Sequence, residues 1–131
     1  MSRYISESLR QLVKERAHYR CEYCLMPEED VFYRHQIDHV ISLKHDGETV
    51  PENLAYACFP CNNSKGTDIG TVLLPNKIFS RLYNPRSDNW NEHFEIDAGV
   101  IYSKSIIGDA TLKILKFNEI DRVIERNILN E

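Results

Sequence analysis

The chain has 131 residues and a formal net charge of −4. This length is typical of one domain with a single core, and no apolar run approaches the roughly eighteen residues that a membrane-spanning helix needs. The negative net charge argues against a protein that coats nucleic acid by bulk electrostatics, because such affinity comes mainly from lysine and arginine side chains.

The first residues, 1–5, lack the apolar core of a signal peptide, so we expect a soluble protein of the reducing cytoplasm. An amphipathic helix is predicted over residues 6–17, with Ser6 as its N-cap and Glu7 in its first turn. The apolar stripe of this helix consists of Leu9, Leu12, Val13 and Ala17.

Two extended segments are predicted in the middle of the chain. Residues 31–37 are rich in aromatic and β-branched residues and indicate a strand, and residues 40–43 indicate a second, shorter one. The polar residues 44–49 follow, with Gly47 as a turn signal, and predict a hairpin or an open loop.

The second half of the chain alternates between helical and extended patterns. In order, we expect a helix that begins near Cys61 and ends near Gly66 or Gly70, a helical turn at 78–83, a turn-rich connector at 84–89, a β-hairpin over 93–106 with its turn at Ala98-Gly99, and a short helix at 109–115. Asn118 is then expected to cap a last helix with an apolar stripe formed by Ile120, Val123, Ile124 and Ile128. Residues 71–131 are expected to dock on the first seventy.

The charges are unevenly distributed. Residues 25–52 carry two basic and seven acidic side chains, whereas residues 1–24 carry five basic and three acidic ones and residues 53–90 carry four and two. A basic rim around an acidic centre suits a metal-dependent enzyme that acts on phosphates, but solvated surface charge would give a similar pattern.

All four cysteines lie in two Cys-x-x-Cys pairs, Cys21 with Cys24 and Cys58 with Cys61. In a reducing compartment such pairs are thiolate ligands rather than disulfides, and four thiolates at this spacing fit zinc better than any other common metal. A four-thiolate site has no open position, so we assign it a structural role. Free buried cysteines and an iron–sulfur cluster are the alternatives.

Four further side chains between and beside the pairs are oxygen or imidazole donors: Asp38, His39, Asn53 and Asn62. In this order, within residues 21–65, they resemble the HNH endonuclease family and its ββα-metal fold. The Asp38-His39 pair resembles the first motif, Asn53-Leu54 the central asparagine, and Asn62 the final position of the branch that ends in asparagine.

The resemblance implies that the carboxylate of Asp38 and the side-chain oxygen of Asn62 hold one divalent cation, Mg²⁺ or Mn²⁺. It also implies that His39 is the general base and that Asn53 orients the hairpin that carries it. Hydrolysis of a phosphodiester needs such a base and such a cation. Because neighbouring residues of a regular strand face opposite ways, Asp38 and His39 share a site only if the strand ends or bends there.

Other polar residues have two interpretations each. Lys65, in the pattern Cys-Asn-x-x-Lys, is a substrate-binding candidate that contacts phosphate, or a solvated lysine. His35 is an extra ligand or substrate contact, or an ordinary strand histidine. His93 is interpreted as part of the core or of an interface. Arg81 and Arg86 are possible phosphate contacts, and His45 has no partner that the sequence indicates.

The C-terminal region is similar to a subgroup of small stand-alone HNH proteins. The matching segments are Asn84-Pro85-Arg86, Trp90, Glu92-His93-Phe94 and Gly108-Asp109-Ala110-Thr111. We therefore predict an α+β fold in one domain, 1–131, with a ββα-metal core at 18–70, an N-terminal helix, zinc knuckles, and a packed extension at 71–131.

The predicted function is a metal-dependent HNH endonuclease that hydrolyses DNA, with RNA not excluded as a substrate, structural Zn²⁺, and no membrane partner. The alternative is a zinc-knuckle module that binds nucleic acid or a protein without cutting. A redox protein is disfavoured, because one zinc ion satisfies both cysteine pairs. No base-reading helix is evident, so we expect weak sequence preference.

Overall fold

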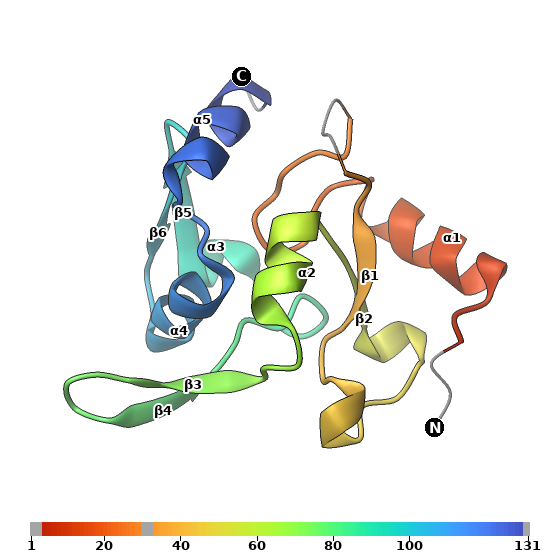
Figure 1. Ribbon diagram of the computed structural model, residues 1–131, viewed down its shortest axis with the longest axis horizontal. Coiled ribbons are helices and arrows are strands. Elements are labelled where there is room, and N and C mark those ends of the chain that lie inside the picture. The colour runs from red at the N-terminus through yellow and green to blue at the C-terminus, as the bar shows by residue number, and fades with distance from the viewer. Residues whose placement is uncertain (1–3, 30–32, 130–131) are drawn as a thin grey trace.

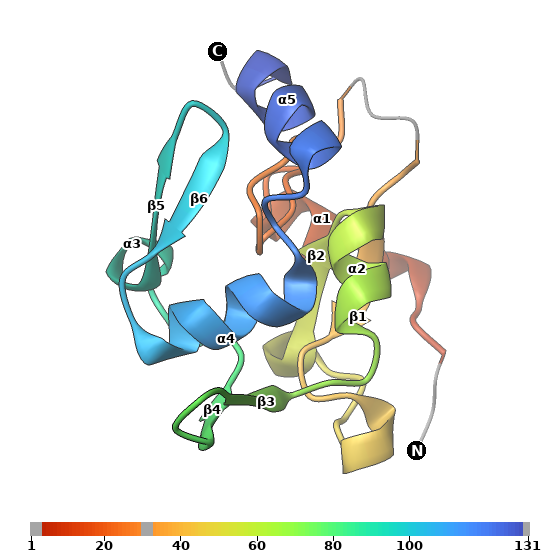
Figure 2. The same cartoon turned by 60° about the vertical axis from the view of Figure 1, so that its left-hand side comes forward.

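The computed structural model describes residues 4–29 and 33–129. Strand β1 (Gln36–His39) pairs antiparallel with β2 (Leu54–Ala57), and helix α2 (Phe59–Lys65) follows and lies against β1. Helix α1 (Glu7–Arg16) covers the opposite side of this hairpin and contacts β2 (Figure 1 and Figure 2). Two strands and a helix thus form the centre of the molecule.

Strand β2 is buried on both faces. Leu54 and Tyr56 pack with Val13 of α1, whereas Ala55 and Ala57 belong to a second hydrophobic cluster on the other side. This is the alternation expected of a strand, whose successive side chains point in opposite directions. The hairpin is therefore held from both sides.

Residues 70–129 form the rest of the fold. The elements are β3 (Gly70–Leu73), β4 (Ile78–Arg81), α3 (Trp90–His93), β5 (Phe94–Asp97), β6 (Val100–Ser103), α4 (Ile106–Leu115) and α5 (Ile120–Leu129). Strand β3 pairs with β4 and β5 with β6, each pair forming an antiparallel hairpin. Helix α4 lies over the β3–β4 hairpin (Figure 2). The mixture of helices and small antiparallel sheets confirms the predicted α+β class.

One hydrophobic cluster joins the central hairpin to this extension. It contains the four cysteines together with Tyr83, Phe94, Ile101 and Phe117 of the extension. The indole Nε1 of Trp90 also donates a hydrogen bond to the carbonyl of Tyr23, at 2.8 Å. The described part of the chain holds no helix with the length and apolar character needed to span a membrane.

The two strands predicted between the cysteine pairs do not lie where they were expected. Strand β1 begins at Gln36 and ends at His39, whereas the predicted strand 31–37 falls partly outside the described residues. The predicted strand 40–43 is absent. The N–H of Val40 still bonds the carbonyl of Asn53, but from Ile41 onward no strand of the described residues continues the pairing. The amide of Asn53 bonds both the N–H and the carbonyl of Ile41, and a 3-10 turn then begins at Leu43.

The predicted helical turn at 78–83 is also wrong, since Ile78–Arg81 is strand β4. Burial alternates from residue 79 to residue 82: Ser80 and Leu82 are buried, whereas Phe79 and Arg81 are exposed. The predicted hairpin after His93 is confirmed, and so is the end of α2 near Gly66. Helix α4 begins earlier than expected, with Ser105 as its N-cap.

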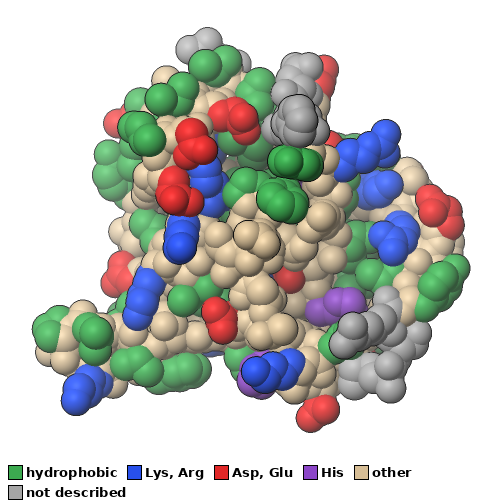
Figure 3. All heavy atoms as spheres, in the orientation of Figure 1, with side chains coloured by type: hydrophobic (Ala, Val, Ile, Leu, Met, Phe, Trp, Pro, Cys, Tyr) green, Lys and Arg blue, Asp and Glu red, His purple; other side chains and the backbone are tan. Residues whose placement is uncertain are grey.

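The last helix differs most from its prediction. Asn118 does not cap it but bonds the N–H and the carbonyl of Ile101, at 2.9 and 2.8 Å, and so fastens the β5–β6 hairpin. The isoleucine stripe faces solvent, with Ile120 74% and Ile128 61% exposed. Figure 3 shows hydrophobic side chains on the surface over α5 and over the β3–β4 hairpin.

Candidate functional site

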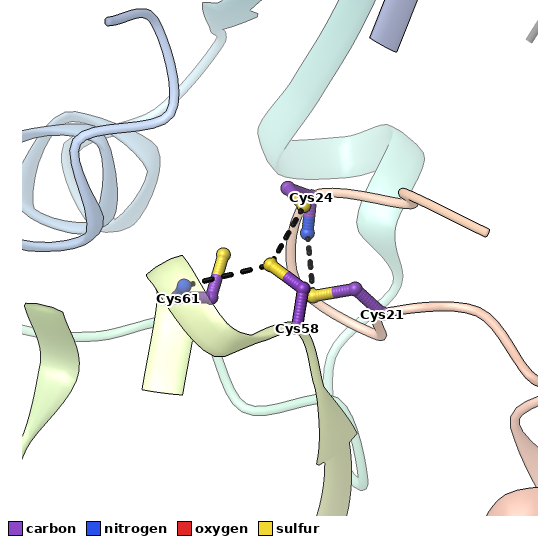
Figure 4. A group of neighbouring side chains, drawn as sticks. All are labelled: Cys21, Cys24, Cys58 and Cys61. Atoms are coloured by element: carbon purple, nitrogen blue, oxygen red, sulfur yellow. Dashed lines mark hydrogen bonds between the residues drawn. The ribbon is translucent and has the colours of Figure 1, made fainter. Parts of the chain in front are cut away.

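The four cysteines converge, as their spacing predicts. Cys21 and Cys24 lie in the loop after α1, Cys58 is the N-cap of α2, and Cys61 lies in its first turn (Figure 4). All are buried and none is in a disulfide. Their Sγ atoms lie within 4.8 Å of one another, which suits a tetrahedral ion with metal–sulfur bonds of about 2.3 Å.

Backbone N–H groups donate hydrogen bonds to two of these sulfurs, which favours their thiolate form. The N–H of Cys24 donates to Sγ of Cys21 at 3.4 Å, and the N–H of Cys61 donates to Sγ of Cys58 at 3.5 Å. Burial raises the pKa of Cys21 and of Cys61 well above the usual value, so thiolates here need a compensating positive charge. The residues present therefore fit a zinc ion, held as a closed structural site.

Two arginines of α5 lie beside the cysteines, and the sequence reasoning missed them. Nη2 of Arg122 lies 2.9 Å from Sγ of Cys61. Burial alone would lower the pKa of Arg122, but the nearby cysteine thiolates outweigh burial and hold that pKa above its usual value. Arg126 is fully buried one turn further along. Arg122 and Arg126 are four residues apart and therefore lie on one face of the helix, opposite the isoleucines. This spacing was the signal in the sequence that could have revealed them.

The second group of predicted site residues lies around β1 and α2. Asp38 is 4% exposed; its Oδ2 accepts a hydrogen bond from the hydroxyl of Tyr23 at 2.7 Å, and its Oδ1 accepts one from Nζ of Lys65 at 3.3 Å. Burial raises the pKa of Asp38, and the Lys65 ammonium and the Tyr23 hydroxyl oppose that rise. The carboxylate is thus positioned by two donors.

His39 is half-buried at the end of β1, where the strand stops. Its Nε2 lies 2.9 Å from Oγ1 of Thr49. Burial lowers the pKa of His39, and the charge of Asp38 partly offsets this effect. A lowered pKa keeps more of the imidazole neutral near neutral pH, which is the form that accepts a proton.

An open cavity of about 600 Å³ is lined by Asp38, His39 and Asn62 together. Asn62 lies in α2 and donates a hydrogen bond from Nδ2 to the side-chain oxygen of Gln36 in β1. This bond leaves Oδ1 of Asn62 as the oxygen for a ligand. One carboxylate and one amide fit a hard cation that takes its other ligands from water and phosphate.

Asn53 lies outside this cavity lining and closes the loop between β1 and β2. Besides its bonds to Ile41, its Nδ2 donates to the carbonyl of Glu48 at 2.9 Å. Gly47 lies against the same residues: a Cβ there would come within 1.6 Å of the Ile41 carbonyl oxygen. The same loop carries Thr49, whose Oγ1 lies beside Nε2 of His39.

The remaining candidates are engaged with protein groups. Lys65 is 1% exposed, so the prediction of a solvated lysine is wrong; its Nζ also donates to the carbonyl of His39 at 3.1 Å. His35 is buried, with Nε2 on the carbonyl of Met26. Arg81 pairs with Asp88.

His93, Arg86 and His45 complete the set. Nδ1 of His93 lies 2.6 Å from Oγ of Ser105, and its ring lies against Tyr83. Arg86 donates to the carbonyl of Leu54 and pairs with Glu22. His45 is exposed in the loop after β1.

Sequence reasoning missed three residues of this second group. Tyr23, Thr49 and Gln36 touch Asp38, His39 and Asn62 respectively. Tyr23 carried an available signal, because it lies between Cys21 and Cys24 and must share their surroundings. Thr49 and Gln36 carried none, because threonine and glutamine have no fixed spacing in such sites.

Comparison with known proteins identifies the central segment. The model of the HNH endonuclease family matches residues 21–68. No curated protein and no solved structure matches the chain. The matched segment contains both cysteine pairs and all four predicted catalytic residues, so the resemblance is confirmed there and a nuclease-type function is indicated.

Proposed function

We propose that this chain, which carries an HNH endonuclease segment, is a metal-dependent endonuclease that hydrolyses phosphodiester bonds of DNA. The observation that carries the proposal is the shared cavity of Asp38, His39 and Asn62 at the junction of β1 and α2. A carboxylate, an amide oxygen and an imidazole in one open cavity are the groups that such a hydrolysis requires.

His39 serves as the general base. Nε2 of His39 lies 2.9 Å from Oγ1 of Thr49, and we assign the ring proton to this nitrogen. The lone pair of the imidazole is then on Nδ1, and Nδ1 takes the proton of the attacking water. The contact with Thr49 fixes the ring, and the loop that Asn53 closes fixes Thr49. The base is thus held through two successive contacts from the β1–β2 loop.

Asp38 and Asn62 would hold the divalent cation, Mg²⁺ or Mn²⁺. That cation supplies positive charge to the phosphate and to the leaving oxygen. Tyr23 and Lys65 hold the carboxylate of Asp38 in place from the interior side. Asn62 is turned by its bond to Gln36. A role for Lys65 in contacting phosphate stays a prediction, and it would require Nζ to leave Asp38.

The test is cleavage of supercoiled plasmid by purified protein with added Mg²⁺ or Mn²⁺. His39→Ala is compared with His45→Ala, which makes the same substitution at an exposed histidine six residues further along. The expected result is a rate lower by about 10²–10⁴-fold in His39→Ala and unchanged in His45→Ala, with equal zinc content and equal circular dichroism.

Equal cutting by His39→Ala and the wild type would overturn the assignment of the base. DNA that is retained in a binding assay but never cut, with either cation, would overturn the endonuclease and support a binding module. A single-stranded RNA and a DNA of the same sequence, assayed in parallel, identify the nucleic acid that is cut. Cleavage at one short site in a mixed DNA pool would reject the expectation of weak sequence preference.

A further inference from the structure

Helix α5 packs with the opposite face from the one expected of an amphipathic helix. Arg122 and Arg126 are 8% and 0% exposed, whereas Ile120 and Ile128 are 74% and 61% exposed. A surface helix ordinarily buries its apolar stripe and leaves its cations in water. Removing two guanidinium groups from water is costly, so the interior must offer them compensating negative charge.

The guanidinium of Arg122 lies between two sources of negative charge. Its Nη2 contacts Sγ of Cys61 at 2.9 Å and Sγ of Cys58 at 3.7 Å. Its Nη1 donates to the carbonyls of Leu115 and Lys116, at 2.6 and 2.9 Å, where α4 ends. The C-terminus of a helix carries partial negative charge. Nη1 and Nη2 of the guanidinium therefore both face groups that favour a cation.

Arg126 extends this arrangement. Its Nε donates to the carbonyl of Gly99 at 2.8 Å, and its Nη2 donates to the carbonyl of Phe117 at 2.9 Å. Burial lowers the pKa of Arg126, and the charge of Cys24 partly offsets this lowering. The second arginine therefore ties the β5–β6 hairpin to α5 and adds positive charge near a third cysteine.

We propose that Arg122, supported by Arg126, forms the outer shell of the zinc site, and that the zinc–thiolate group holds α5 on the core. Four thiolates around one zinc ion carry a net charge of about −2, which two guanidinium groups balance. Hydrogen bonds from such outer partners orient the ligands and strengthen metal binding. The extension beyond residue 68 thereby becomes part of the metal site. This assignment does not depend on nuclease activity.

The first test measures zinc affinity by competition with a chelating indicator. Arg122→Met keeps an unbranched apolar stem and removes the charge, and Arg122→Lys keeps the charge but replaces the planar, two-pronged guanidinium with an ammonium group. Arg10→Met on α1 is the control for the substitution. We expect zinc to bind about 10–100-fold more weakly to Arg122→Met, by less than that to Arg122→Lys, and as in the wild type to Arg10→Met.

The second test uses the protein loaded with Co²⁺ in place of zinc. A hydrogen bond from Arg122 stabilises the lone pairs of the cysteine sulfur, so its loss should move the thiolate-to-metal charge-transfer band to lower energy. We expect the full shift in Arg122→Met, a smaller one in Arg122→Lys, whose ammonium keeps the charge, and none in Arg10→Met. A merely structural arginine would leave the band in place. If Arg122→Met does not fold, the position of the charge-transfer band can still be measured in Arg122→Lys.

Hydrogen exchange of the zinc-loaded proteins then reports on docking. In Arg122→Met we expect faster exchange in residues 120–129, with α2 still protected. Unchanged zinc affinity together with an unmoved cobalt band in the Arg122 variants would overturn the proposal. Slower or equal exchange in α5 of Arg122→Met would overturn the claim that the zinc–thiolate charge holds this helix.

Discussion

The side chains of Lys65 and Asp38 form an ion pair with almost no access to water, at 1% and 4% exposure. An ion pair at this depth gives little net stability, but removal of one partner leaves the other charged and uncompensated. Tyr23 gives Asp38 one further donor, which does not replace a charge. Asp38 therefore depends on a positive charge from within the protein or from a bound cation.

We predict that Lys65→Met lowers the free energy of unfolding by about 3–5 kcal/mol, because the buried carboxylate loses its counter-charge. Denaturation in urea at fixed zinc content measures this change. The double variant Lys65→Met with Asp38→Asn should recover part of the loss. Additive effects of the two substitutions would show that the pair is not coupled.

The same variant examines the cation proposed at Asp38. If Mg²⁺ binds this carboxylate, then millimolar Mg²⁺ should raise the melting temperature of Lys65→Met more than that of the wild type, because only the variant lacks a counter-charge. An equal effect of Mg²⁺ on both proteins would argue against Asp38 as its ligand.

At the residue scale, the sequence predicted those site residues that belong to a recognised motif. Asp38, His39 and Asn62 were expected together, and they line one cavity. The contact between His39 and Thr49 was not expected, because it joins residues ten positions apart through a loop whose path depends on Asn53. Such supporting contacts follow from backbone geometry that no local pattern encodes.

Among the elements, the β1–β2 loop is the one whose shape is most tightly constrained. Ile41 approaches Gly47 so closely that any side chain at Gly47 would overlap a backbone carbonyl. The loop must therefore open if Gly47 is replaced, and Thr49 must then move away from His39. A methyl group at this position would also lie 2.9 Å from Nδ2 of Asn53, and we expect it to change the site without touching Asp38, His39 or Asn62.

We predict that Gly47→Ala lowers both stability, by about 1–3 kcal/mol, and the rate of DNA cleavage. Gly108→Ala is the matched control, because a Cβ there would lie 2.5 Å from the His93 carbonyl oxygen, in the extension. At a temperature where both variants are folded by circular dichroism, only Gly47→Ala should cut slowly. Slow cutting by Gly108→Ala alone would reverse this interpretation.

The mispredicted elements have a common physical cause. Strand β4 and helix α5 were interpreted from apolar residues on the assumption that these residues are buried, yet Phe79 and Ile120 are exposed. The periodicity of a segment indicates its conformation only when the apolar side faces the core. In α5 the charge of the thiolate site decides which face turns inward, and Cys61 of this site lies 61 positions from Arg122 in the chain.

At the scale of the whole molecule, the zinc site and the extension share one hydrophobic cluster. The matched segment 21–68 was predictable, because ligands and catalytic groups have characteristic spacings. The extension was predictable only in part: the β5–β6 hairpin has a turn signal at Ala98-Gly99, whereas the β3–β4 hairpin does not stand out from a helical pattern.

We predict that removal of zinc by a strong chelator unfolds the central hairpin and the extension in one transition. Binding of structural zinc typically contributes about 10–16 kcal/mol to folding. Most domains have a free energy of unfolding of roughly 5–15 kcal/mol, so loss of the zinc can remove all of it. Trp90, the only tryptophan, reports on this process because its indole is bonded to Tyr23 beside the first cysteine pair. Its fluorescence should shift to the red together with loss of far-ultraviolet circular dichroism.

Addition of zinc should restore both signals. A tryptophan emission that stays unchanged while zinc is fully removed would show that the extension holds the loop of Cys21 and Cys24 in place without the metal.

The arginines buried beside the cysteines also predict how related sequences vary. A relative that had lost the cysteine pairs and filled the space with apolar side chains would have two unbalanced cations at the positions of Arg122 and Arg126. Such a sequence should therefore carry uncharged residues there, because an uncompensated buried charge costs several kcal/mol. Cysteines and arginines should be inherited or lost together, across more than fifty residues of intervening chain.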